Sequence, residues 1–170
     1  ITHYGEQSYY SEPGANILVT AHSNGDGEGI TTTDIHDDPT TTSDDAGYDN
    51  GNVTNSFGGT SSATPLAAGV IALILDANEN ITWRDLQHIL VNSARKNDPN
   101  DSSWEINDAG HDVSHKYGFG AIDAGRAVSL AENWTNVDEE VNLTFGPYTP
   151  SFTIPTSTNS WSEFDVQITD

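Results

Sequence analysis

The residues with the clearest capacity for chemistry lie in the run 58–69, which contains Ser61. Glycine allows a tight turn before the serine, and small neighbours let a substrate backbone approach closely. The apolar run 70–75 predicts a buried helix, whose free N–H groups and positive dipole end would face Ser61. Pro65 suits the first turn of that helix, where N–H groups have no intrahelical partner. The pattern favours a nucleophilic serine on a rigid support, although a bare Gly-Thr-Ser is also typical of a turn and N-cap.

Two longer stretches carry a family resemblance. Residues 59–69, Gly-Thr-Ser-Ser-Ala-Thr-Pro-Leu-Ala-Ala-Gly, resemble the serine-nucleophile signature of the subtilisin-like proteases, or subtilases, throughout. Residues 80–88, Asn-Ile-Thr-Trp-Arg-Asp-Leu-Gln-His, look like the kexin and furin branch, the proprotein convertases, and residues 47–57 resemble its bacterial members. The resemblance implies a serine endopeptidase that forms an acyl-enzyme at Ser61. The backbone N–H of Ser61 would then be one oxyanion donor.

The fold class follows mostly from the same resemblance. It identifies residues 1–134 as the C-terminal part of a subtilase catalytic domain, an α/β three-layer fold with a parallel sheet. The resemblance places the start of an all-β, P-domain-like sandwich at residues 135–170, on position more than on motif. We expect a strand over 16–21 closed by a turn at Asn24-Gly25, a short strand over 29–33, and a polar loop over 98–110. Thr82 followed by Asp85 is a variant of the capping box and predicts a helix from 82 to about 95, with Trp83 in the core; the last helix spans 124 to 133.

The histidine base and the aspartate that a serine nucleophile needs are not recognisable in this chain. None of the six histidines precedes Gly-Thr, the context of the subtilase base, and no aspartate or asparagine matches the other family motifs. In subtilases these residues precede the serine segment, so the resemblance places them before Ile1. The upstream part of the same domain is therefore an expected partner. We expect residues 1–170 alone to be inactive and poorly folded.

One carboxylate matches a calcium ligand of the family. In kexin-like enzymes a Tyr-Ser-Glu stretch precedes a strand, and its glutamate helps bind calcium beneath the primary specificity pocket; Glu12 matches that position. Calcium takes about six to eight oxygen ligands, so most of them would come from outside this segment. The alternative is an exposed loop carboxylate. Eight further acids in residues 26–55 fit no EF-hand spacing and favour a solvated loop over a second calcium site.

The composition restricts the partners and the location. Against 26 acidic residues stand only 5 Lys plus Arg, a formal net charge of −21. Nucleic acid is therefore an unsuitable partner, and protein or peptide substrates fit better. The acids are compatible with cation binding, with basic substrates, or with a hydrated surface suited to high salt, which we favour. A secreted or extracellular location follows, and we expect no membrane span in this segment.

Two other functions remain open from the sequence. The chain could be a subtilase-derived binding or adhesive module with a decayed triad, although the intact context of Ser61 argues against decay. A lipase-type hydrolase would need Gly-x-Ser-x-Gly, and the motif fails at Ala63. Phe57 and His22 depart from the histidine and proline common in convertases, which leaves the fine substrate preference open. A preference for paired basic residues would depend largely on acidic residues upstream of this segment.

Overall fold

The computed structural model describes residues 1–35, 47–49 and 51–140. The chain divides into two compact units, Ile1–Val137 and Asp138–Asp170. Most of the second unit lies outside the described residues, and with it the predicted strands of the β-sandwich. The domain boundary after residue 134 therefore stays a prediction.

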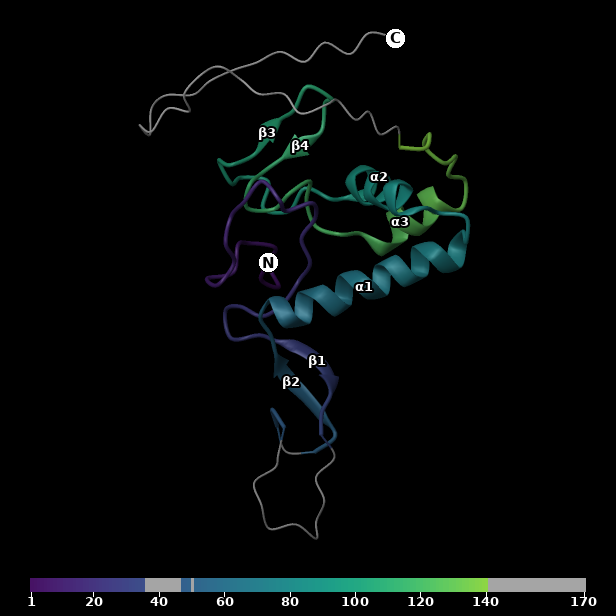
Figure 1. The fold of residues 1–170 in the computed structure, drawn as a ribbon. Coiled ribbons are helices and arrows are strands. Elements are labelled where there is room, and N and C mark those ends of the chain that lie inside the picture. Colours follow the sequence, from purple (N-terminus) through teal and green to yellow (C-terminus); the bar gives the residue numbers. More distant parts are fainter. Residues whose placement is uncertain (36–46, 50, 141–170) are drawn as a thin grey trace, which may run out of the picture. The chain divides into compact units, whose positions relative to one another are not determined.

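Three helices build the core of the first unit (Figure 1). They are α1 (Thr60–Ala77), α2 (Trp83–Ser93) and α3 (Ala124–Ala131). The short helix α3 packs against both α1 and α2, because its face of small residues lets the backbones approach. Buried side chains from all three helices and from the loop before α2 form one cluster: Val70, Ile74, Ile81, Ile89, Leu90, Ala127 and Ala131.

The strand predicted at 16–21 is wrong as a regular strand, because this segment forms only one isolated parallel bridge. Phe119 N–H donates to the Leu18 carbonyl at 2.8 Å, and Thr20 N–H to the Gly120 carbonyl at 2.9 Å. Thr20 and Ala121 form the parallel bridge itself. A Cβ at Gly120, whose φ is 127°, would lie 2.5 Å from the Arg95 carbonyl oxygen, so the close approach needs glycine. Within the described residues, this bridge is the only part of the expected parallel sheet that forms.

Two antiparallel hairpins complete the fold. Strand β1 (Ile30–Thr33) confirms the short strand expected near this position, and it pairs with β2 (Val53–Phe57). The sequence did not predict β2, because its mainly polar residues lack an apolar alternation. Strands β3 (Glu105–Ile106) and β4 (Asp112–Val113) form the second hairpin, and β3 lies in the segment 98–110 that the sequence indicated as a polar loop.

The boundaries of α2 and α3 agree with the sequence within two residues, but the position of one side chain does not. Thr82 caps α2, and Asp123 caps α3 by accepting from the Arg126 N–H. Trp83 is 64% exposed, so its predicted core position is wrong. It stands at the first position of α2, and the face toward the core cluster is carried further on by Ile89 and Leu90.

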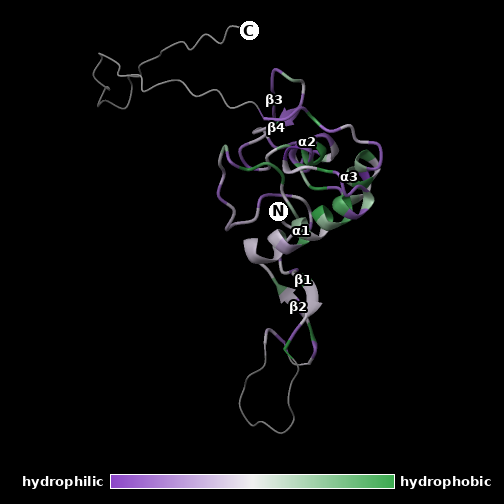
Figure 2. Cartoon of the chain, turned by 45° about the vertical axis from the view of Figure 1, so that its right-hand side comes forward, coloured by the Kyte–Doolittle hydropathy of each residue, from purple (hydrophilic) through white to green (hydrophobic). Residues whose placement is uncertain are grey.

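Helix α1 is far less covered than its apolar sequence predicts. Of its 18 residues only Ser62, Val70 and Ile74 are buried, while Leu73 and Leu75 are 51% and 41% exposed. Its later turns are hydrophobic in Figure 2, and its length and apolar composition would also suit a membrane span. A core helix passes the same test. In the described part of the chain, α1 lacks the surrounding layers that the sequence leads one to expect.

Candidate functional site

The turn that carries Ser61 is built around Gly59. Gly59 is the N-cap of α1 with φ 74° and ψ −175°, a conformation that glycine adopts without strain. No side chain caps the helix, and Ser61 lies in its first turn. Pro65 lies inside α1 rather than in its first turn, so the sequence interpretation was wrong there. Its ring nitrogen cannot donate to the Ser61 carbonyl four residues back.

Two adjacent serines in this turn have opposite environments. Ser61 is exposed, whereas Ser62 is only 2% exposed. The Ser62 hydroxyl lies within hydrogen-bond distance of two acceptors, the Ser23 hydroxyl oxygen and, at 3.0 Å, the Gly59 carbonyl oxygen, and its single proton serves one or the other. Of the two hydroxyls, that of Ser61 is therefore the one that a substrate can reach.

Side chains from the N-terminal segment support this turn through hydrogen bonds to Gly59. The Asn24 Oδ1 accepts from the Gly59 N–H at 2.6 Å and from the Tyr10 hydroxyl at 2.7 Å. The Ser23 hydroxyl donates to the Gly59 carbonyl oxygen at 2.7 Å. Sequence reasoning missed all three side chains. The signal at Asn24-Gly25 was interpreted as a turn, and nothing local indicates a partner 35 residues away.

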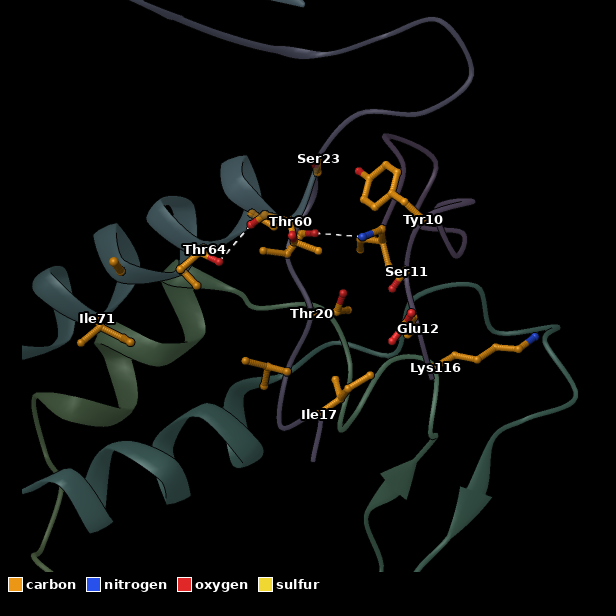
Figure 3. A pocket seen from close by; sticks show the side chains of 16 residues that line it. Tyr10, Ser11, Glu12, Ile17, Thr20, Ser23, Thr60, Thr64, Ile71 and Lys116 are labelled. Carbon is orange, nitrogen blue, oxygen red and sulfur yellow. Dashed lines mark hydrogen bonds between the residues drawn. The ribbon is translucent and has the colours of Figure 1, made fainter. Parts of the chain in front are cut away.

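A broad hollow of about 710 Å³ runs along one side of α1 (Figure 3). Tyr10, Ser23 and Thr60 line one end of it, and Ile17 and Ile71 lie farther along. Ser61 is not among the residues that line this hollow, although its neighbour Thr60 is. The hollow is predominantly apolar and lies beside the turn that carries Ser61.

Glu12 also lines this hollow, as does Lys116 (Figure 3). The Lys116 ammonium pairs with Asp101 at 2.7 Å, so it is already neutralised by another carboxylate. Glu12 is exposed, and among the described residues no group of three or more His, Asp or Glu is placed to hold a metal ion. The role of Glu12 as a calcium ligand therefore stays a prediction.

Two acids of the 26–55 region have structural roles. Asp34 accepts from the Tyr48 and Asp49 N–H groups, each at 2.8 Å. These bonds, led by that from Asp49, lower the pKa of Asp34. Asp49 in turn accepts from the Thr54 hydroxyl and the Asn55 N–H, and the hydroxyl bond is the main cause of its lowered pKa. These two carboxylates join the ends of the β1–β2 hairpin.

The five histidines within the described residues do not approach the Ser61 hydroxyl by a hydrogen bond. His22 Nδ1 lies 2.8 Å from the Thr2 carbonyl oxygen, and His111 packs edge-on against Phe119. His36 lies outside the described residues. This part of the chain therefore brings a candidate nucleophile and its supporting turn together without a base.

Comparison with known proteins gives concordant results. The Subtilase family model matches residues 3–120. Furin from Rattus norvegicus is 41% identical over 138 residues, which cover 80% of this chain and 16% of furin. Kexin from Saccharomyces cerevisiae is 39% identical over 155 residues, covering 91% of this chain and 17% of kexin.

The solved structures give the same picture. The crystal structure of a serine protease of Aeromonas sobria matches with a TM-score of 0.69 and 28% identity. The match covers 79% of this chain and 29% of that protein. The chain thus spans about a sixth of the length of furin and kexin, and under a third of the bacterial protease.

Proposed function

This chain belongs to the subtilase family, and from that premise we propose that Ser61 is the nucleophile of a serine endopeptidase. The observation that supports the role is the exposed Ser61 hydroxyl in the first turn of α1, beside a buried and hydrogen-bonded Ser62. A glycine N-cap and small neighbours leave room for a peptide backbone to approach.

The chemistry would proceed by acyl transfer. Ser61 Oγ attacks the peptide carbonyl carbon while its proton passes to a histidine supplied from outside this chain. The N–H of Ser61 has no carbonyl partner within the helix, so it is free to donate to the oxyanion. Collapse of the tetrahedral intermediate breaks the C–N bond, and the amine leaves with the proton. Water then releases the acyl group by the same steps in reverse order.

The finer properties are part of the same proposal. Glu12 would be one ligand of a structural calcium ion, which would neutralise acidic groups near the site and stiffen the segment that bears them. Substrates would be proteins or peptides, with any preference for basic residues set largely by acids outside this chain. A secreted or extracellular location is consistent with a formal net charge of −21.

The exposed apolar residues of α1 support a domain completed by upstream residues. Leu73 and Leu75 are exposed, and the walls of the hollow include Ile17, Val19 and Ile71. An apolar surface of this kind is normally covered by another layer of the same domain. We expect the upstream part of the catalytic domain to pack there, and residues 135–170 to begin a β-sandwich.

The test uses the full-length protein with calcium present. Wild type and Ser61→Ala are compared on a mixture of neutral and dibasic peptides, with Ser129→Ala, an exposed serine on α3, as the matched control. We expect kcat to fall by about a millionfold in Ser61→Ala, the scale of losing a triad nucleophile, and to stay unchanged in the control. Equal cleavage by Ser61→Ala, or none by wild type, would reject the nucleophile and favour a binding or adhesive module.

A further inference from the structure

Both backbone polar groups of Gly59 are held by one short segment. Asn24 Oδ1 accepts the Gly59 N–H at 2.6 Å, and the Ser23 hydroxyl donates to the Gly59 carbonyl oxygen at 2.7 Å. The two anchoring residues are consecutive, so the segment grips the peptide units on either side of Gly59. The next residues of the chain are Thr60 and Ser61, and the grip therefore fixes the direction in which α1 starts.

The orientation of the Asn24 amide is determined by its partners. The Gly59 N–H can only donate, so the oxygen and not the nitrogen of the amide must face it. The Tyr10 hydroxyl reaches the same oxygen at 2.7 Å and the Asn24 main-chain oxygen at 3.0 Å. Tyr10 thereby holds both the side chain and the backbone of Asn24 in place.

Gly58 packs closely against the Asn24 side chain. A Cβ at Gly58 would lie 2.2 Å from Asn24 Cγ and 2.3 Å from its Oδ1. The absence of a side chain at position 58 is what allows the amide to reach Gly59. Helix α1 has no side-chain N-cap of its own, so this contact from a distant segment restrains a start that is otherwise uncapped.

We propose that Asn24 is a positioning residue that sets the direction of Ser61 through the Gly59 N–H, with Tyr10 orienting its amide, a role that rests on Ser61 being the nucleophile as proposed above. Tyr10 stands two residues before Glu12. The chain of hydrogen bonds from Tyr10 through Asn24 to Gly59 thus connects the segment of Glu12 to the start of α1.

The experiment uses matched variants of the full-length protein. Asn24→Asp keeps an acceptor of the same shape, Asn24→Leu removes it at similar size, and Tyr10→Phe removes one hydroxyl. Asn78→Leu is the control, because Asn78 stands at the other end of α1 and donates to the Ala131 carbonyl at 2.9 Å. For each variant we measure kcat, KM, the rate of labelling by a fluorophosphonate, and Tm.

We expect kcat and the labelling rate to fall by about tenfold to a hundredfold in Asn24→Leu, with KM within about threefold, because a small misplacement of a reacting atom has effects of this size. Tyr10→Phe gives a smaller loss of the same kind, and Asn24→Asp stays within about threefold of wild type. Asn78→Leu lowers Tm without the loss of kcat.

Each other result overturns the inference in a recognisable way. A wild-type kcat in Asn24→Leu, or an equal loss in Asn78→Leu at the same drop in Tm, shows that Asn24 has no positioning role while Ser61 keeps its own. If Asn24→Leu does not fold, an unchanged kcat and labelling rate in Tyr10→Phe rejects the role. A wild type that is neither labelled at Ser61 nor able to cleave peptides removes the proposed function, and the role of Asn24 with it.

Discussion

Helices α1 and α2 begin in opposite ways. Thr82 caps α2 with its side chain, and the Asp85 carboxylate returns a bond to the Thr82 N–H, which forms a full capping box. Helix α1 begins at a glycine with positive φ and has no side-chain cap. The start of α2 therefore has donors satisfied by side chains of its own sequence, whereas the start of α1 has no side-chain cap, and in its first turn the Ser62 N–H donates to the Gly59 carbonyl oxygen at 3.2 Å.

The start of α2 is also hydrogen-bonded to the C-terminal end of the first unit. Asp85 is 0% exposed, and its Oδ1 accepts from the Trp134 indole N–H at 3.0 Å and from the Val137 N–H at 2.7 Å. Burial alone would raise the pKa of this carboxyl, but the hydrogen bonds from Thr82, Val137 and Trp134 outweigh it and hold the pKa well below its usual range. The two helices thus differ in how they begin: α2 has a buried, fully bonded carboxylate at its start, and α1 has an uncapped start that carries the proposed nucleophile.

The largest effect on stability should come from Asp85→Asn. The amide keeps the shape but turns one acceptor into a donor, which would then face either the donors of Thr82 or those of Trp134 and Val137. We expect the free energy of unfolding of the full-length protein to fall by about 2–5 kcal/mol, because buried donors lose their partner. Chemical denaturation measures it, and kcat of the folded fraction should stay unchanged.

Asp108→Asn, at an exposed loop position, serves as the control and should change the unfolding free energy by less than about 0.5 kcal/mol. A loss in Asp85→Asn no larger than in this control would contradict the role of the buried carboxylate. A loss of kcat in Asp85→Asn without a loss of stability would show that the start of α2 also affects activity, contrary to the proposed difference between the two helices.

The pH dependence of stability tests the same carboxylate. Since the folded pKa of Asp85 lies below the unfolded value of about 3.9, its contribution is complete above that pH and is lost as pH falls toward the folded pKa. We expect the stability gap between wild type and Asp85→Asn to narrow steadily below about pH 4. Other carboxylates with lowered pKa values, such as Asp101, are present in both proteins and cancel. A gap constant from pH 6 to pH 2 would contradict the assignment.

Local sequence predicted the features that depend on neighbouring residues. The Thr82 and Asp85 pair predicted the capping box of α2, and the structure confirms it. Predictions that depend on distant layers did less well. The apolar run of α1 indicated a buried helix, yet Leu73 is 51% exposed in the described residues, because the layer that would cover it is not among them. Strand β2 has a polar sequence, and only its pairing with β1 defines it.

In the candidate site too, local sequence predicted some residues and could not predict others. Ser61 was found from a contiguous motif, and the structure adds that its hydroxyl is exposed while that of Ser62 is not. The support from Asn24 could not be found, since a hydrogen bond between segments 35 residues apart leaves no periodic or local pattern. Glu12 was identified by motif, and its role as a calcium ligand stays a prediction.

At the open helix start, Gly59→Ala should affect chemistry more than stability. Alanine at φ 74° and ψ −175° is strained by about 1–3 kcal/mol, and the turn can relieve that strain by moving Ser61. We expect kcat to fall at least about tenfold with a modest drop in Tm. Gly125→Ala on α3 is the control, where a Cβ would make an ordinary contact at 3.6 Å, and it should leave kcat unchanged. Equal kinetics in the two variants would show that the Gly59 conformation is not needed.

The smallest effect should come from the third helix start, which is intermediate between the other two. Asp123 caps α3 with one side-chain bond from the Arg126 N–H at 3.0 Å, and its weak pairing with the Arg126 side chain at 3.9 Å is partly exposed. Asp123→Ala should therefore lower the unfolding free energy by about 0.5–1 kcal/mol, and Asp123→Asn, which keeps a capping oxygen, by less. Urea denaturation of both variants decides between a cap and a charge effect. If the two variants lose the same stability, the carboxylate charge and not the cap sustains α3, and the ranking of the three starts by their capping bonds does not hold.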